Sequence, residues 1–595
     1  MDILAFSFYT EKHKKYTSEL KSVSQKIHRF AWYRFSAFVC IFTPPFVFGI
    51  KSWVTLILSL SAIVFFFFLI KKNLQLEKRK SKFIELKKLV EDELLALKHS
   101  FSHFQNGEEF LDTDHFFSYD LDLFGEGSLF QFLNRTSTVG GRLKLANWLI
   151  KPPVNKEIIE KRQHAIRELT EIPNWRLHFL ANGNLFNETE ELNHEIKEWS
   201  QLELTLNRAS KVKWLIRLVP LITIVSAIPA FMGISNLFIT LTVLLQWFLM
   251  YFFWQRITQY FGYFGRKSEL LSKYMQLLRF VEEREFQAEY LVDLQKKVQK
   301  PESASKVFMQ LKSLVKELEY RQNIVVGIFL NSFFLWDIRC VFKLWNWHRI
   351  NHKKLAIWLD VVAEVDALIS LANYSNNHPQ FIFPEIHEGG FKFHAIKLGH
   401  PLLNSEKRIA NDIEINGWSK VLIVTGANMA GKSTFLRTVG VNLILGRMGA
   451  PVCAENMILT PISIYTNMRT TDSLLKDESY FYAELKRLKG VLDRLQNGER
   501  IFVILDEMLK GTNSVDKLNG SKELIRKLVE FKSISLIATH DLKLSEMEDE
   551  FPQRVFNKCF EIKIENDELV FDYLLSDGVT KTMNATFLMK KMGII

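Results

Sequence analysis

The stretch TGANMAGKST, Thr425 to Thr434, decides how the C-terminal part of this chain is expected to fold. From Gly426 onward it fits the pattern G-x-x-x-x-G-K-[ST], in which glycines let backbone N–H groups surround the oxygens of a phosphate. In that pattern Lys432 supplies a positive charge to the β/γ-phosphates, and Ser433 offers its hydroxyl to Mg²⁺. An apolar run precedes it and a helical run follows it, a context that a glycine turn matching by chance would lack. The stretch therefore predicts a phosphate-binding loop.

Short β-branched runs alternate with helical segments through the last part of the chain. The runs are VLIVT (421–425), IFVIL (501–505) and SLIAT (535–539), and Thr434–Leu445 is the helical segment after the first run. This alternation is typical of a parallel α/β sheet. The sequence texture changes near Pro384–Gly390, so we expect an α/β domain over residues 390–595.

Polar residues follow the second and third of these runs. Asp506 and Glu507 close the second run, where an aspartate can hold Mg²⁺ through water and a glutamate can orient or deprotonate an attacking water. Many strands end in acidic turns, so Asp506 and Glu507 indicate a catalytic role only together with the predicted phosphate-binding loop that precedes them in the sequence. His540 follows the third run and can sense a γ-phosphate, although a lone histidine is more often structural. Asp472–Leu488 has the pattern of an amphipathic helix, which by itself demands no further role.

The bulk composition bounds the class of protein. At 595 residues the chain is expected to hold several domains, because one hydrophobic core rarely serves more than about 250–300 residues. Hydrophobic residues make up 48% and charged residues 24%, so the chain is not a bundle of membrane spans throughout. The net charge of +11 suits an anionic partner, either nucleic acid or a lipid headgroup surface. Scattered cysteines without metal-ligand spacing predict reduced thiols and no structural metal.

Two pairs of apolar stretches lie outside the α/β part: Phe35–Ile50 with Ser52–Ile70, and Leu218–Ile234 with Leu237–Trp254. A helix that spans a membrane needs about 17–25 apolar residues, so the first stretch is marginal and the others fit. Lysines and arginines flank both pairs. By the positive-inside rule, each hairpin then enters the membrane from the cytoplasmic face and returns to the same face. We expect an integral membrane protein of the cell inner or plasma membrane, with its soluble domains in the cytoplasm. The alternative is a pair of buried helical hairpins.

Residues 390–595 resemble the ATPase domain of the MutS family of DNA mismatch-repair proteins. TGANMAGKSTFLR is similar to the P-loop of that family, and LDEMLKGTNSVD to its Walker B strand and the loop that follows. SYFYAEL resembles the Ser-x-Phe-x-x-Glu signature helix, and ATHDLKL the segment that carries the switch histidine. HPLL (400–403) and NDI (411–413) match the lead-in to the sheet.

The resemblance extends toward the N-terminus. LFGEGSLFQFLNRTSTVGGRLKLANWLIKPP (123–153) and RQHAIREL (162–169) are similar to the family's lever domain, so the resemblance covers about residues 116–213 and 255–595. The chain also departs from the family. Leu509-Lys510 replaces the Gly-Arg after the Walker B glutamate, and we expect no mismatch-recognition domain ahead of the lever. The second apolar pair is inserted in the lever, from which the DNA-gripping clamp is missing.

The resemblance implies a composite ATPase site in a homodimer, with ATP and Mg²⁺ as cofactors. Asn428 would help to hold the γ-phosphate, and Asp506 would hold Mg²⁺ together with Ser433. Glu507 would activate water, with His540 as the second catalytic residue. The implied nucleotide-binding residues are Gly426, Ala427, Asn428, Met429, Ala430, Gly431, Lys432, Ser433 and Thr434. Those that would complete the neighbouring subunit's site are Ser479, Gly511, Thr512, Asn513, Ser514 and Asp516.

The expected fold class is multidomain: an α-helical lever with two transmembrane helical hairpins, followed by an α/β P-loop domain of the ABC-like type. Residues 71–100, 268–318 and 355–374 are expected to be helical. The predicted parts are a cytosolic N-terminal segment (1–34), a transmembrane hairpin (35–70), a helical connector (71–115), the first part of the lever (116–213), a second transmembrane hairpin (214–256), the rest of the lever (257–389) and the ATPase domain (390–595).

These features predict a membrane-tethered MutS-like ATPase that acts as a homodimer and binds DNA, with mismatch recognition in doubt. Its third partner would be the lipid bilayer, through four transmembrane helices. One alternative is an ATP-driven membrane scaffold or sensor that does not bind DNA. Another is an ABC-type transporter, which is disfavoured because four spans are few and no LSGGQ signature lies between Lys432 and Asp506. No charged residue inside the apolar stretches marks a substrate path either.

Overall fold

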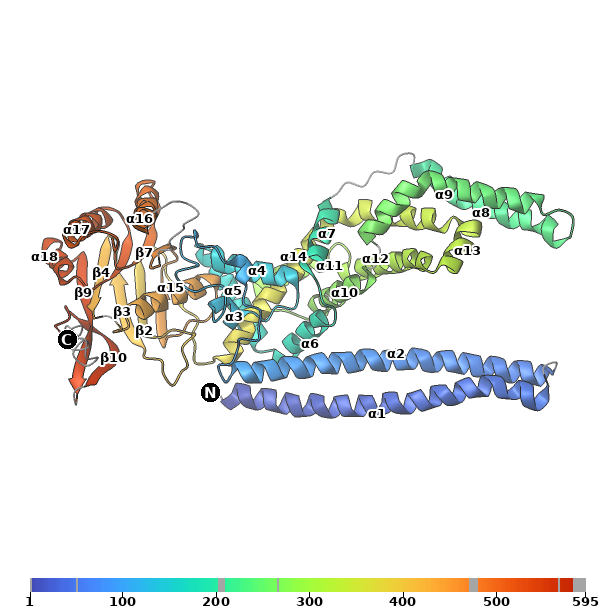
Figure 1. The fold of residues 1–595 in the computed structure, drawn as a ribbon, viewed down its shortest axis with the longest axis horizontal. Coiled ribbons are helices and arrows are strands. Elements are labelled where there is room, and N and C mark those ends of the chain that lie inside the picture. Colours follow the sequence, from blue (N-terminus) through green and yellow to red (C-terminus); the bar gives the residue numbers. More distant parts are fainter. Residues whose placement is uncertain are drawn as a thin grey trace.

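The computed structural model describes residues 3–49, 52–201, 209–264, 267–427, 429–469, 480–565 and 568–581. The molecule is elongated, with an α/β body at one end, a helical lever in the middle and two helical hairpins that point away from the body (Figure 1). Asn428 and Ser479, both predicted site residues, lie outside the described residues.

The larger sheet of the body has the strand order β10-β9-β4-β8-β7-β6, with β10 antiparallel to β9 and the other neighbours parallel. The predicted runs form its centre and are almost wholly buried, as strands of a parallel sheet covered on both faces must be. The strands are β4 (Lys420–Gly426), β6 (Ser463–Asn467), β7 (Ile501–Asp506), β8 (Ile534–Thr539), β9 (Val555–Glu565) and β10 (Glu568–Asp577).

A smaller sheet in the order β1-β5-β2-β3 adjoins the larger one. Its strands are β1 (Glu385–Ile386), β2 (Lys392–Leu398), β3 (Asn411–Asn416) and β5 (Asn456–Leu459). The helices of the body are α15 (Lys432–Met448), α16 (Tyr480–Gln496), α17 (Ser514–Glu530) and α18 (Met547–Glu550). Helix α15 is buried along most of its length because it contacts β4, β7 and β8 as well as α4 and α5 of the lever. Arg447 near its end donates to the carbonyl of Pro153, 3.2 Å away, which ties body to lever.

The lever is built around α14 (Trp336–Asn377), which packs against α4, α5, α7 and α12. The sequence predicted helix throughout 268–318, but this segment is broken into α10, α11 and α12, with Pro301 in the second break. Proline cannot donate the backbone hydrogen bond that a continuing helix needs. Other helices of the lever are α3 (Leu129–Leu133), α4 (Val139–Ile150), α5 (Lys156–Thr170), α6 (Pro173–Asn184), α7 (Glu190–Gln201), α10 (Ser268–Glu283), α11 (Glu289–Gln299) and α12 (Ala304–Glu319).

The two hairpins are α1 (Ile3–Phe48) with α2 (Trp53–Ala96), and α8 (Ala209–Phe231) with α9 (Leu237–Phe264). All four helices are long and apolar enough to cross a membrane by length and composition. In the first hairpin the apolar stretches form the outer ends of two longer helices. The inner ends pack on α6 through a small core of Tyr9, Tyr16, Leu86, Val90, Leu177 and Ala181. The outer ends of both hairpins point the same way (Figure 1).

Candidate functional site

The predicted phosphate-binding loop joins the end of β4 to the start of α15. Gly426 and Gly431 have φ angles of 154° and 102°, which side-chain-bearing residues rarely adopt. Space also demands glycine, because a Cβ at Gly426 would lie 3.0 Å from the Phe560 carbonyl oxygen. A Cβ at Gly431 would lie 3.0 Å from the ring of Tyr573. Glycine at both positions therefore lets the loop pack closely against β9 and β10.

Lys432 is buried at the first position of α15. Its Nζ donates to the carbonyl oxygens of Gly426 and Ala427, at 2.6 and 3.0 Å. Burial lowers the pKa of Lys432, and the nearby charges of Glu507 and Asp506 oppose that shift. The ammonium is thus held by the loop's own carbonyls, close to where an anion in the loop would attract it.

Acidic and imidazole groups meet beside this loop because β4, β8 and β7 are adjacent and parallel, so their carboxyl ends share one edge of the sheet. Glu507 follows β7, and its Oε1 lies 3.2 Å from Nδ1 of His540, which follows β8. Burial alone would raise the pKa of Glu507, but the charges of His540 and Lys510 and the hydrogen bond from His540 lower it overall. A carboxylate with a lowered pKa is ionised at neutral pH.

A cavity of about 420 Å³ connects these groups. Of the predicted site residues it is lined by Ala427, Met429, Gly431, Lys432, Ser433, Thr434 and Glu507. Asp506 and His540 lie at the same edge of the sheet but are not among the described lining residues. The sequence-based prediction missed the far wall, which comes from β2, β10 and the segment between β2 and β3. That wall is formed by Leu398, His400, Leu403, Lys407, Ile409 and Tyr573. The HPLL motif was the available signal for two of these residues.

The loop from Gly511 to Asp516 lies at the start of α17 and is not among the described residues that line this cavity. Asn513 caps α17 by accepting from the backbone N–H groups of Val515 and Asp516, at 3.1 and 2.9 Å. Gly511 packs on Phe481 of α16 so closely that a Cβ there would lie 2.7 Å from the phenylalanine Cβ. The described lining of the cavity includes none of the residues predicted to complete the neighbouring subunit's site within this loop. These are Gly511, Thr512, Asn513, Ser514 and Asp516.

Helix α16 holds the loop after β7, where the chain departs from the resembled family. Glu484 is buried, and its two carboxylate oxygens accept from the backbone N–H groups of Leu509 and Lys510, at 2.6 and 3.1 Å. The loop needs this support because Glu507 and Leu509 have φ angles of 57° and 55°, a region that costs free energy for residues other than glycine. Burial raises the pKa of Glu484, against the effect of the two backbone hydrogen bonds.

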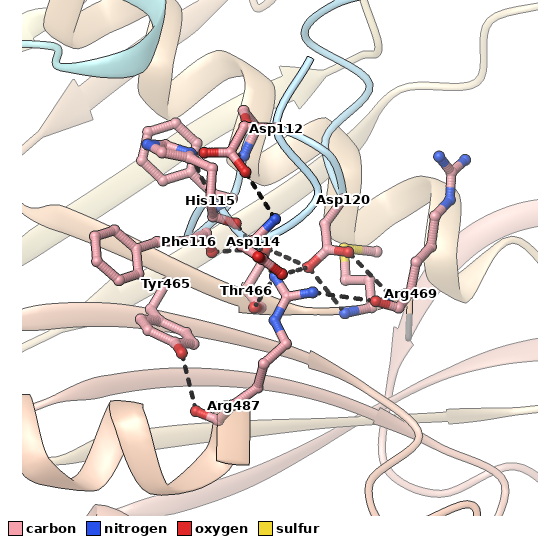
Figure 2. Close-up of polar contacts among 12 residues, drawn as sticks. Asp112, Asp114, His115, Phe116, Asp120, Tyr465, Thr466, Arg469 and Arg487 are labelled. Atoms are coloured by element: carbon pink, nitrogen blue, oxygen red, sulfur yellow. Dashed lines mark hydrogen bonds and ion pairs between the residues drawn. The ribbon is translucent and has the colours of Figure 1, made fainter. Parts of the chain in front are cut away.

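The same helix is bound to the lever through Asp120, the centre of the polar network in Figure 2. Asp120 is fully buried, and its Oδ2 accepts from Thr466 Oγ1 at 2.6 Å and from Arg487 Nη2 at 3.2 Å. Its Oδ1 accepts from the backbone N–H of Arg469 at 3.0 Å. Arg487 lies three residues after Glu484 on α16, so the contacts to the lever and to the loop after β7 are about one helical turn apart.

Fold and site together define a multidomain, mostly helical protein whose lever is joined to an α/β body with a glycine-rich loop. Two family matches agree with this division: MutS domain V over residues 422–590 and MutS domain III over residues 111–248. The chain belongs to the MutS family. The domain III match begins in the loop that carries Asp120 and runs into α9.

Curated relatives match part of the chain. The DNA mismatch repair protein MutS of Thermotoga petrophila is 31% identical over 249 residues, which is 41% of this chain and 30% of the relative. MutS of Ehrlichia ruminantium is 33% identical over 236 residues, covering 38% of this chain and 28% of the relative. MutS protein homolog 4 of Mus musculus is 31% identical over 236 residues, covering 38% and 24%. The matched region thus spans 30% or less of the length of these relatives.

Proposed function

We propose that the protein is a membrane-tethered MutS-like ATPase that hydrolyses ATP in a composite site of a homodimer. One observation carries the ATPase part: the glycine-rich loop, the buried Lys432 and the ionised Glu507 line a single cavity. The loop fits a phosphate because Gly426 and Gly431 give it positive φ angles and the buried ammonium of Lys432 lies against its carbonyls. Ser433 and Asp506 are the residues that would hold Mg²⁺, which when bound neutralises charge on the phosphates.

The remaining chemistry is assigned to this chain's own groups. Lys432 leaves its loop carbonyls and binds phosphate oxygens, while backbone N–H groups of the loop surround them. Glu507 orients the attacking water and accepts its proton, which its lowered pKa permits at neutral pH. His540 orients the Glu507 carboxylate through their 3.2 Å contact. Asn428, outside the described residues, is proposed to help hold the γ-phosphate.

Substitution of Glu507 separates hydrolysis from binding. Glu507→Gln keeps the size of the side chain but removes the base, so ATP is expected to bind while turnover falls by about 10²-fold or more. Lys432→Ala is expected to weaken ATP binding itself. Equilibrium binding of a fluorescent ATP analogue and steady-state phosphate release measure the two properties. Glu530→Gln, at the exposed end of α17, is the matched control and should change neither. Unchanged turnover in Glu507→Gln would show that another residue positions the water.

The membrane tether is supported by the arrangement of α8 and α9. The polar residues Thr223 and Gln246 are buried between these helices, where Gln246 Nε2 donates to Thr223 Oγ1 at 2.7 Å. Large apolar residues such as Phe248 and Phe252 face outward. In water this arrangement is unfavourable, whereas in lipid polar groups must be satisfied inside the protein and apolar groups face the solvent. We propose that α1, α2, α8 and α9 span the inner or plasma membrane, with the soluble parts in the cytoplasm.

DNA is the proposed ligand because the curated relatives include proteins named for DNA mismatch repair. We expect DNA to be held mainly by Lys/Arg–phosphate contacts, because the chain carries a net charge of +11. Binding is then expected to fall steeply with salt and to differ little between matched and mismatched duplexes. The test measures ATPase activity of detergent-solubilised protein with homoduplex, mismatched, branched and single-stranded DNA. A response to none of them would favour an ATP-driven scaffold or sensor, or a transporter.

A further inference from the structure

Helix α13 (Ile324–Phe334) exposes large apolar residues and buries small or polar ones. Ile324, Val325, Ile328 and Phe329 form its outer face and are 75%, 77%, 50% and 57% exposed. Its buried residues are Gly327, Asn331 and Ser332. A helix on a water-facing surface has the opposite pattern, with apolar residues toward the core and polar residues outward. The outer face of α13 must therefore be covered by lipid or by protein and not by water.

The polar residues near the end of α13 make hydrogen bonds where the chain turns into α14. Gln246 of α9 accepts from the backbone N–H of Leu335 at 3.0 Å, and Asn331 accepts from that of Asp337 at 2.9 Å. Ser332 Oγ accepts from Trp247 Nε1 at 3.1 Å. Both donors at the break thus find partners inside the protein. A helix break at membrane depth is tolerated only under this condition, because lipid offers no hydrogen bonds.

The place of α13 fits the membrane depth of the second hairpin. It contacts both α8 and α9 and lies beside them, between their inner and outer ends (Figure 1). Its partner Trp247 follows the first residue of α9, Leu237, by 10 residues, which is about 15 Å of helix. That is about half of a hydrocarbon core of about 30 Å. With 11 residues α13 is too short to span, and its exposure rules out a buried core helix, so a re-entrant or interfacial helix remains.

The charges that flank α13 are neutralised where the chain enters and leaves it. Arg321 Nε lies 3.4 Å from Asp337 Oδ2, and the Arg321 guanidinium lies 5.2 Å from the ring centroid of Phe261. Phe261 is near the inner end of α9, away from the hairpin tip. A charge near the membrane is tolerated when it is paired in this way.

We infer that α13 is a re-entrant helix whose apolar face lies in the cytoplasmic leaflet of the bilayer, as a fifth membrane-embedded element. Lipid is the cover because the apolar face of α13 adjoins the outward apolar face of α9. A protein interface, in contrast, has a polar rim around its apolar centre. The inference rests on the proposed membrane tether. Its test must therefore separate failure of the tether from failure of α13 to enter lipid.

The test places a fluorophore on single cysteines in the full-length protein. Cys40 is changed to Ser because it is exposed, whereas Cys340, Cys453 and Cys559 are buried and stay. Labels at Val325→Cys and at the control positions Phe248→Cys of α9 and Met309→Cys of α12 are compared, since all three native side chains are exposed. The protein is reconstituted into phosphatidylcholine–phosphatidylglycerol vesicles that carry acyl-chain nitroxide lipids. Iodide serves as the aqueous quencher.

The labels at Val325 and Phe248 are expected to be quenched by nitroxide lipid to a similar extent and shielded from iodide, and the label at Met309 the reverse. Quenching at Phe248 but iodide access at Val325 would overturn the re-entrant helix and leave the tether intact. Shielding of Val325 from both quenchers would also overturn it, in favour of a protein cover. Loss of lipid quenching at Phe248 as well would overturn the tether and the re-entrant helix together. Retained ATPase activity verifies that each labelled variant is folded.

Discussion

Glu484 is the residue through which α16 holds the loop that carries Glu507. Glu484→Gln offers one carbonyl oxygen in place of two carboxylate oxygens, so Leu509 N–H or Lys510 N–H loses its acceptor. Glu507 and Leu509 have left-handed backbone conformations. Without the contacts from Glu484, we expect the loop to relax and to move the Glu507 carboxylate out of position. Turnover should fall by roughly 10-fold to 10²-fold with ATP affinity little changed.

The control for Glu484 is Asp493→Asn, an exposed residue on the same helix. It should leave both parameters near those of the unmodified protein. Equal losses of ATP affinity and turnover in Glu484→Gln would indicate general disruption of the body rather than positioning of the loop. The measurement is a comparison of single-turnover rate with the equilibrium constant for ATP binding.

Partly buried histidines predict acid sensitivity. Burial lowers the pKa of His378 to about 3 and that of His400 to about 4, and nearby arginines add to both shifts. Between about pH 6.5 and pH 4 the unfolded chain binds these protons and the folded chain does not, so stability falls as the pH falls. Each histidine contributes at most roughly 1.4 kcal/mol per pH unit in this window.

The expected result is a thermal midpoint that decreases from about pH 7 to about pH 5, with a shallower decrease in His378→Gln. Thermal unfolding of the detergent-solubilised protein, followed by intrinsic fluorescence, measures this slope. A midpoint that rises toward acid pH would contradict the assigned direction of the shifts.

At the scale of elements, α16 joins the lever to the site. Asp120→Asn and Arg487→Gln each leave a buried charged or polar partner unmatched, so both should lower the thermal midpoint. Because they act on one contact of 3.2 Å, the double variant should lose clearly less than the sum, with a coupling of about 0.5–3 kcal/mol. The exposed pair Lys522–Glu546, at 2.9 Å, is the matched control and should couple by about 0–1 kcal/mol. If the losses of stability in Asp120→Asn and Arg487→Gln were additive, the contact between these two side chains would not stabilise the junction of α16 and the lever.

The sequence predicted those elements whose pattern is local. The strands β4, β7 and β8 are short apolar runs that end beside predicted site residues. The predicted ends of each strand differ from the observed ends by at most one residue. β6 and β10 were missed because polar residues interrupt their apolar pattern. Helix α13 was missed because 11 residues fall below the length of a membrane span, and its inverted burial is visible only once α8 and α9 are in place.

The same distinction applies to the site. The residues from Gly426 to Thr434 and Glu507 were predicted because each motif is contiguous and carries its own chemistry. The contact of Asp120 with Arg487 joins residues 367 positions apart, and no local pattern indicates it. The roles of all the predicted site residues stay predictions, and Asn428 and Ser479 also lie outside the described residues.

At the scale of the whole molecule, the α/β body, which holds the cavity, and the hairpin tips lie at opposite ends of an elongated structure (Figure 1). The lever lies between them, and α14 runs through it for 42 residues, which is about 63 Å of helix. Asp120 and Arg447 tie the body to this lever. A movement of the body would therefore be transmitted through the lever toward the proposed membrane segments.

The composite site predicts that two inactive variants restore each other. If Ser479 acts on the partner's nucleotide, each site draws Lys432 from one chain and Ser479 from the other. Homodimers of Lys432→Ala and of Ser479→Ala then carry a defect in both sites. In a mixed dimer one site collects both defects and the other keeps an intact lysine and an intact serine. Mixing the two variants under exchange conditions should therefore restore at most one working site per mixed dimer.

Recovery is measured as ATPase activity of mixed dimers isolated through two different affinity tags, so that dimer formation is verified independently of activity. Lys432→Ala mixed with a differently tagged copy of itself is the control, and it should stay inactive because every site lacks the lysine. If Ser479 instead served the nucleotide of its own chain, each site of the mixed dimer would carry one defect and nothing would recover. Isolated mixed dimers without activity would therefore reject the composite site, whereas recovery would require that each nucleotide is completed by the partner subunit.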